Sequence, residues 1–166
     1  MNKIFGATRP VPLFGVEWDS TTERRRNFWI FGPAEVGKTK AVRHFTQDWT
    51  FFNRLTAPGY YEGYNGEEFI LVDDQDKDPP SKDEITHMTN GAEEKGKWPV
   101  YSRTRYTNFY LKAGVQPRFI IISQEQPALL QERWFSSRFI VLEVRERRGD
   151  GYGPEVEWDV REIQPE

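Results

Sequence analysis

One segment, GPAEVGKT at residues 32–39, restricts the possible folds of this chain more than any other. It fits the pattern G-x-x-x-x-G-K-[ST], whose glycines let the backbone curl so that its N–H groups point inward at phosphate oxygens. An apolar run at residues 27–31 precedes the segment, and apolar positions on one face of a predicted helix follow it. This context favours a phosphate-binding loop over the alternative, a glycine turn at an unrelated helix start. The residues predicted to hold a nucleotide are Gly32, Pro33, Ala34, Glu35, Val36, Gly37, Lys38 and Thr39.

The chemistry of such a loop lies in its last two side chains and in a nearby carboxylate. The ammonium of Lys38 is predicted to reach the β- and γ-phosphates, and the hydroxyl of Thr39 to ligate Mg²⁺. The run FILVDD then supplies Asp73 to hold the metal and Asp74 to polarise the attacking water. Two adjacent acids after an apolar strand favour hydrolysis over kinase chemistry, with a solvated strand-end pair as the alternative. The predicted cofactors are ATP and Mg²⁺.

Further apolar runs predict the remainder of a sheet. They alternate with helical segments, one of them capped by Ser81, which favours an α/β fold with a mostly parallel five-stranded sheet. A glycine-rich turn after the last run predicts a closing hairpin with residues 156–160. Gln124 follows one run directly, so its amide is a candidate to bond the γ-phosphate or the lytic water. Besides residues 27–31, the runs are 49–52, 69–72, 118–123 and 137–144.

Charge is distributed unevenly along the chain. The net charge is −3, yet residues 95–124 contain six Lys and Arg and no Asp or Glu. Within this segment, residues 98–114 interleave cations with aromatic rings, which is what a groove for a single nucleic-acid strand requires. The alternative is an exposed hairpin with an apolar inner face. We predict a β-hairpin insertion that binds nucleic acid through Arg103, Arg105, Tyr106 and Lys112.

Composition excludes several other kinds of site. The chain has 166 residues and no Cys, so it has neither disulfides nor thiolate metal sites, and its two His are isolated. No run of residues approaches the ~18 apolar residues of a membrane span, and no signal-peptide pattern opens the sequence. We therefore expect a soluble, intracellular protein without a membrane partner.

Taken together, these motifs give the chain a family resemblance. It resembles the superfamily 3 helicase domain of replication initiator (Rep) proteins from circular single-stranded DNA viruses, circoviruses and geminiviruses among them, and related plasmids. The tract YYEGYNGEE is the most particular feature, because it looks like the run that circovirus-like Reps carry before the second carboxylate motif. The likeness covers roughly residues 28–144 and rests on GPAEVGKT (32–39), YYEGYNGEEFILVDD (60–74), KAG (112–114) and IIISQ (120–124).

The resemblance implies a P-loop NTPase fold of the AAA+-like type and an ATP-dependent motor that moves on single-stranded DNA in rolling-circle replication. Position by position, it implies Lys38 and Thr39 as Walker A residues and Asp73 and Asp74 as Walker B residues. Lys112 stands where the family's DNA-contacting hairpin lysine falls, although the usual Lys-Gly-Gly reads Lys-Ala-Gly here. Two rival functions stay open: an NTPase acting on RNA or protein, and a nucleotide-gated binding module with little turnover.

The resemblance also concerns subunit assembly. Gln124 replaces the family's usual Asn, and its extra methylene alters the geometry at the phosphate. Family members work as rings in which an arginine from one subunit completes the next subunit's site. Arg138 is the first candidate for this arginine and Arg133 the second, with a strand-edge surface role as the alternative for Arg138. The implied partners are single-stranded DNA and, for the full-length protein, further copies in a hexameric ring, with a monomer as the alternative for this chain alone.

Three parts of the chain are expected. Residues 1–27 form a largely irregular lead-in, residues 28–144 the P-loop ATPase/helicase domain, and residues 145–166 a C-terminal hairpin or tail without a predicted function. Reps usually begin with a nicking domain that carries a His-hydrophobe-His motif, and no such pair occurs in this sequence. We therefore expect no DNA nicking from this chain, and a location in the host nucleus if it is viral or in the cytoplasm otherwise.

Overall fold

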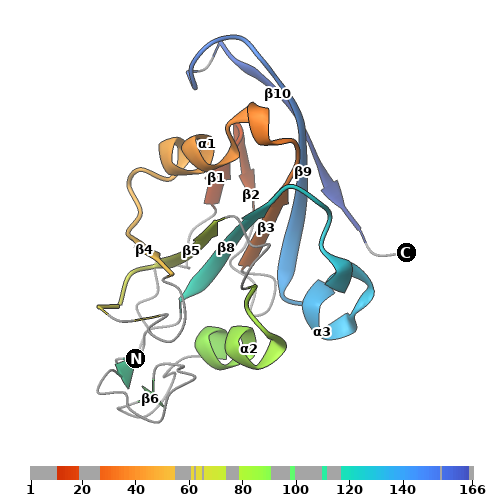
Figure 1. Cartoon of the computed structure of the whole chain (residues 1–166). Coiled ribbons are helices and arrows are strands. Elements are labelled where there is room, and N and C mark those ends of the chain that lie inside the picture. Colours follow the sequence, from red (N-terminus) through yellow and green to blue (C-terminus); the bar gives the residue numbers. More distant parts are fainter. Residues whose placement is uncertain are drawn as a thin grey trace.

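A six-stranded sheet lies at the centre of the computed structural model (Figure 1). Its strand order is β10-β9-β3-β8-β5-β4, in which the five strands from β9 to β4 are parallel and β10 is antiparallel to β9. The strand bounds are β3 Asn27–Phe31, β4 Phe51–Asn53, β5 Phe69–Asp73, β8 Arg118–Ser123, β9 Phe139–Arg148 and β10 Glu157–Ile163. The structure describes residues 11–18, 27–54, 61, 63–64, 66–73, 79–90, 98–99, 110–111, 117–153 and 155–164.

This sheet confirms a mixed α/β fold with a mostly parallel sheet, but the predicted strand count of five is wrong by one. The sixth strand arises because β9 continues past Val144 to Arg148, and the glycine-rich turn then returns the chain so that Glu157 pairs with Arg148. The closing hairpin predicted with residues 156–160 is therefore present, and it belongs to the sheet itself.

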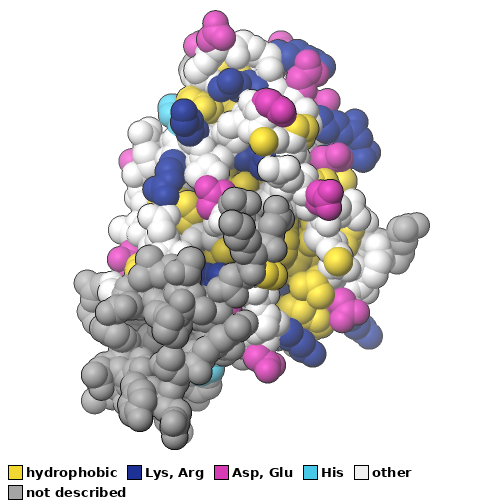
Figure 2. Space-filling view, viewed as in Figure 1, with side chains coloured by type: hydrophobic (Ala, Val, Ile, Leu, Met, Phe, Trp, Pro, Cys, Tyr) yellow, Lys and Arg dark blue, Asp and Glu magenta, His cyan; other side chains and the backbone are white. Residues whose placement is uncertain are grey.

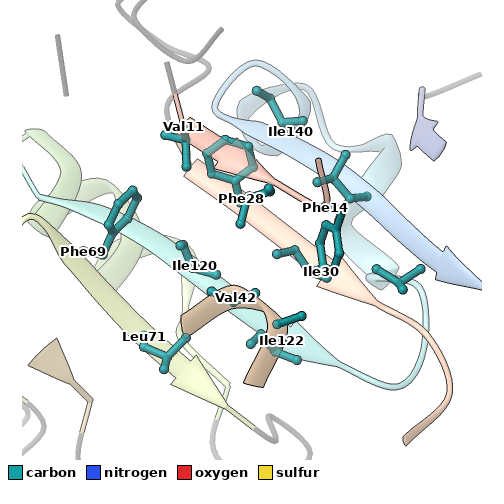
Figure 3. Close-up of a cluster of buried hydrophobic side chains, with 14 of the residues drawn as sticks. Val11, Phe14, Phe28, Ile30, Val42, Phe69, Leu71, Ile120, Ile122 and Ile140 are labelled. Atoms are coloured by element: carbon teal, nitrogen blue, oxygen red, sulfur yellow. The ribbon is translucent and has the colours of Figure 1, made fainter. Parts of the chain in front are cut away.

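The central strands are buried on both faces, which explains their continuous apolar sequences. Along β3, Phe28 and Ile30 point into one buried cluster, while Trp29 and Phe31 point into the other. On the first face, the sheet is covered by α1 (Lys38–Phe45) and by residues of β1 (Val11–Leu13), as Figure 3 shows for part of this cluster. On the second face, it is covered by α2 (Lys82–Asn90), η3 (Ala128–Gln131) and α3 (Arg133–Ser136).

Two short hairpins flank this core. The first pairs β1 with β2 (Val16–Trp18) inside the lead-in that we expected to be largely irregular, and it buries Val11 and Leu13. The second pairs β6 (Trp98–Pro99) with β7 (Tyr110–Leu111) and so closes the base of the predicted basic hairpin. Residues 100–109 lie outside the described residues.

Helix α2 begins where the sequence indicated. The hydroxyl of Ser81 accepts the backbone N–H of Glu84 at 3.1 Å, as an N-cap side chain does. The described helix ends at Asn90, and its predicted continuation to about residue 94 falls outside the described residues. In the described part of the chain, no helix combines the length and apolar character that a bilayer crossing requires.

The parallel arrangement brings the carboxyl ends of several strands together at one edge of the sheet. Because parallel strands end on the same side, the loop after β3, Asp73 at the end of β5 and Gln124 after β8 all lie at the carboxyl edge. Strand β9 passes beyond this edge, since Glu143 pairs with the last residue of β3 and the strand runs on to Arg148. Any ligand held after β3 therefore has β8 and β5 on one side and the extension of β9 on the other.

Candidate nucleotide-binding site

The loop after β3 has a backbone that only glycine permits at its first position. Gly32 has φ 155°, and a Cβ added there would lie 2.1 Å from the carbonyl oxygen of Val144 in β9. The chain then makes a 3-10 turn, η2 (Ala34–Val36), and enters α1 through Gly37 in the left-handed conformation. The glycines of the predicted motif are thus explained by close packing at one position and by backbone conformation at the other.

Lys38 is held inside the curve of this loop. Its ammonium donates to the carbonyl oxygens of Gly32 at 2.6 Å and Pro33 at 2.8 Å, and its side chain is buried. Burial lowers the pKa of Lys38, while the carboxylates of Asp73 and Glu35 act in the opposite direction. A buried ammonium bonded to neutral carbonyls, at a helix start, is suited to receive a phosphate anion.

Thr39 and Asp73 bring two oxygen atoms together across the site. The hydroxyl of Thr39, in the first turn of α1, donates to Oδ2 of Asp73 at 2.9 Å. Hydroxyl and carboxylate oxygens are the hard ligands that Mg²⁺ takes, usually together with phosphate oxygens and water. The pair therefore fits a magnesium ion. Asp74, the second predicted acid, lies outside the described residues and stays a prediction.

These residues surround one cavity. It has a volume of about 440 Å³, within the range of small-molecule sites, and its lining includes Lys38, Thr39, Asp73 and Gln124. Gln124 is placed by its neighbour Ser123, whose hydroxyl accepts the indole N–H of Trp29 at 2.8 Å and donates to the carbonyl of Glu125 at 2.7 Å. With Ala34, Glu35 and Gly37, which also line the cavity, the structure brings together seven predicted site residues from three separate parts of the sequence.

Arg138 lies away from this cavity. It precedes Phe139, the first residue of β9, and its guanidinium donates to the carbonyl of Trp134 at 3.0 Å. Phe139 pairs with the first residue of β3, so Arg138 is at the amino edge of the sheet, opposite the phosphate-binding loop. Arg133 opens α3 and is exposed. A role for either arginine at a neighbouring subunit stays a prediction.

The predicted nucleic-acid contacts lie outside the described residues. They are Arg103, Arg105, Tyr106 and Lys112. Only the pairing of β6 with β7 bears on them, because it brings the two ends of the predicted hairpin together. Their role stays a prediction.

Five residues that line the cavity were not predicted as site residues. Three of them, Lys40, Ile122 and Ser123, lie close in sequence to predicted ones, whereas two come from a part of the chain without a predicted function. These two are Arg147 at the end of β9 and Tyr152 in the following turn. The sequence analysis placed both in the C-terminal hairpin or tail, to which it assigned no function. The one available signal was an aromatic residue inside the glycine-rich turn GDGYG, since such a turn does not need one.

Comparison with curated proteins gives no match to this chain. Comparison with protein families does give one. Residues 28–107 match the family model described as RNA helicase, a family of superfamily 3 helicase domains found in viral proteins. The matched segment runs from β3 to the predicted basic hairpin and includes the phosphate-binding loop and Asp73. The match and the fold together indicate a nucleoside-triphosphate-driven, helicase-like domain.

Proposed function

We propose that this chain is the ATP-hydrolysing motor domain of a replication initiator and that it moves along single-stranded DNA. The observation that carries the proposal is the contact between Thr39 and Asp73 beside the buried ammonium of Lys38. A hydroxyl, a carboxylate and a lysine from two chain segments meet at the end of one loop, as binding of a metal–triphosphate requires.

Each residue has a distinct task in this proposal. Lys38 exchanges its two carbonyl acceptors for phosphate oxygens, and Thr39 and Asp73 hold Mg²⁺, which when bound neutralises charge that develops on the phosphates. Gln124 reaches from the end of β8 toward the terminal phosphate or the attacking water. Asp74 polarises that water. The basic hairpin grips the strand, and Arg138 of a neighbouring subunit completes the site in a ring.

RNA is the second candidate for the nucleic acid. The family description favours it, because residues 28–107 match a family named for RNA helicases. The sequence likeness to Reps favours DNA. Both candidates share the same ATP site and differ only in which strand stimulates turnover.

Phosphate release from ATP tests the proposal and separates these candidates. The assay compares Mg²⁺ with EDTA across protein concentration, with no nucleic acid, single-stranded DNA, or single-stranded RNA of matched sequence. Lys38→Ala is the inactive variant, and Lys82→Ala, an exposed lysine of α2, is the matched control. We expect Mg²⁺-dependent turnover that rises with protein concentration and with DNA and is lost only in Lys38→Ala. Stimulation by RNA alone supports the second candidate, and ATP binding without turnover at any concentration contradicts the motor.

A further inference from the structure

We propose that Arg147 is a second phosphate-binding cation of this site, supplied in cis by the β9–β10 hairpin to the same nucleotide that Lys38 holds. The proposal rests on the proposed function, since it takes the ligand of the cavity to be a nucleoside triphosphate. It assigns a nucleotide-binding role to the segment 145–166, for which the sequence predicted none.

The position of Arg147 supports this role. Its guanidinium lies beside the turn into α1, where Nη1 is 4.0 Å from the position that a Cβ on Gly37 would occupy. The backbone N–H groups at this turn are those that a phosphate-binding loop aims at its ligand. Arg147 therefore approaches the phosphate position from the hairpin while Lys38 approaches it from the loop, and both line the same cavity.

The charge of Arg147 is available to a ligand. Its neighbours in the hairpin are paired: Arg145 and Arg161 with Glu143, and Arg148 with Glu146 and Glu157. Among the described residues, Arg147 forms no salt bridge, and its guanidinium makes one long hydrogen bond, at 3.4 Å, to the carbonyl of Gly151. A planar guanidinium with donors to spare matches phosphate oxygens better than any other side chain.

Aromatic packing holds the guanidinium in place before a ligand arrives. Its carbon lies 5.2 Å from the ring centroid of Tyr152 and 6.0 Å from that of Trp158. Tyr152 in turn stacks on Trp158 at 6.2 Å and contacts the ring of His44 in α1 at 5.7 Å. Basic side chains are visible over this upper part of the molecule, where α1 and the hairpin lie (Figure 2). The hairpin is thus fixed against the helix that begins the phosphate-binding loop.

The sheet order indicates which phosphates Arg147 contacts. Asp73 and Gln124 come from β5 and β8, on one side of β3, and they surround the place proposed for the terminal phosphate. Arg147 comes from β9, on the other side of β3. It therefore contacts the phosphates nearer the nucleoside, which ATP and ADP share. Loss of its charge is expected to weaken both nucleotides and to raise KM more than it lowers kcat.

Calorimetric titration with Mg²⁺-ATP and with Mg²⁺-ADP tests this. The variants are Arg147→Met, which keeps the stem over the rings, and Arg147→Lys, which keeps the charge, while Arg148→Met is the matched control because Arg148 is exposed and paired with Glu146. We expect Arg147→Met to weaken both nucleotides about tenfold, the value of one charge-assisted hydrogen bond. Arg147→Lys is expected to keep most of the affinity, and the control all of it.

Each contrary outcome identifies what fails. Wild-type affinity for both nucleotides in Arg147→Met, with binding abolished in Lys38→Ala, overturns the role of Arg147 and leaves the proposed function standing. A loss for ATP but not for ADP overturns the assignment to the phosphates that both nucleotides share, because that result places the cation at the terminal phosphate. An unaltered chain that binds neither nucleotide overturns the proposed function as well. Thermal unfolding of each variant shows whether a loss is local. If Arg147→Met does not fold, Arg147→Gln takes its place, because it also removes the charge, and unchanged ADP affinity and KM in Arg147→Gln decide against the role.

Discussion

Arg54 and Glu84 form a buried, two-point salt bridge between the end of β4 and the first turn of α2. Nε of Arg54 lies 2.5 Å from one carboxylate oxygen and Nη2 lies 2.9 Å from the other, and the two side chains are 4% and 0% exposed. The hydroxyl of Tyr61 donates to the same carboxylate. Tyr61 belongs to the tract YYEGYNGEE, and its hydrogen bond to Glu84 anchors this residue of the tract. The cluster of Arg54, Tyr61 and Glu84 thus joins the edge strand β4 to α2, a helix that covers the second face of the sheet.

Removing the charge of Glu84 is expected to destabilise the fold strongly. Glu84→Gln keeps the shape of the side chain but leaves a buried guanidinium without its counter-charge, which costs about 3–5 kcal/mol in comparable buried pairs. Urea denaturation gives the free energy of unfolding, and Asp83→Asn, an exposed neighbour on the same helix turn, is the matched control. A loss in Glu84→Gln no larger than that in Asp83→Asn contradicts a buried, uncompensated charge.

The same cluster predicts a loss of stability in alkali. Burial, and secondly the charge of Glu84, raises the pKa of Tyr61 well above its ordinary value of 10.0. The folded state then keeps a proton that the unfolded state loses above about pH 10, so stability is full below that pH and falls as pH rises further. Unfolding free energies measured from pH 9 upward are expected to decline less steeply in Tyr61→Phe than in the unaltered protein. Parallel declines would exclude Tyr61 as a source of the effect.

The sheet could largely be predicted from the sequence because its central strands are buried on both faces. Phe28, Ile120 and Leu71 lie in continuous apolar runs that alternate with helical segments, so approximate strand positions and a mostly parallel sheet followed from the local pattern. The positions of Lys38, Thr39 and Asp73 could be predicted equally well, since a fixed motif and a strand end determine where they lie. The sequence could not show that Gly32 is required by Val144, because that contact joins two strands far apart in the chain.

The extension of β9 was less predictable for a physical reason. Beyond Val144 the strand has no parallel neighbour and pairs only with β10, so its residues are charged and resemble a solvated segment. Arg147 is distinguished from Arg145 and Arg148 by what it faces, not by its residue type. Only the turn geometry, which folds Tyr152 back toward Gly37, shows that this side of the hairpin lines the cavity.

Gly32 is expected to tolerate no side chain. In Gly32→Ala the new methyl group meets a backbone oxygen at 2.1 Å, which a small rotation cannot relieve, so β9 and the loop must separate. Gly15→Ala is the matched control, because Gly15 also has a positive φ but has nothing within 4 Å of the added Cβ; its cost is about 1–2 kcal/mol of backbone strain. Thermal unfolding and ATP binding are expected to be impaired more in Gly32→Ala. Equal losses of thermal stability and ATP binding in the two variants would show that the loop moves away from Val144 and accommodates the methyl group.

Asp73→Asn is expected to separate nucleotide binding from metal use. The amide still accepts the hydroxyl hydrogen of Thr39 but lacks the negative charge that is proposed to hold Mg²⁺. Titration with ATP in Mg²⁺ and in EDTA is expected to show a large Mg²⁺ effect in the unaltered protein and little in the variant, with phosphate release lost. A Mg²⁺ effect of unchanged size in Asp73→Asn would place the metal on other residues.

Arg138 offers a test of the proposed assembly, because it lies at the edge of the sheet opposite its own cavity. An arginine supplied in trans raises turnover by about 10³ or more in related phosphoryl-transfer systems. Arg138→Ala is therefore expected to lose turnover at all protein concentrations while it keeps its affinity for ATP. Mixing it with inactive Lys38→Ala subunits is expected to restore phosphate release, since one variant contributes the arginine and the other the intact ATP site.

Arg145→Ala, which removes an exposed arginine of β9, is the control for this experiment. Full turnover of Arg138→Ala alone would remove this residue from the mechanism, and no recovery on mixing would show that its loss acts within its own subunit.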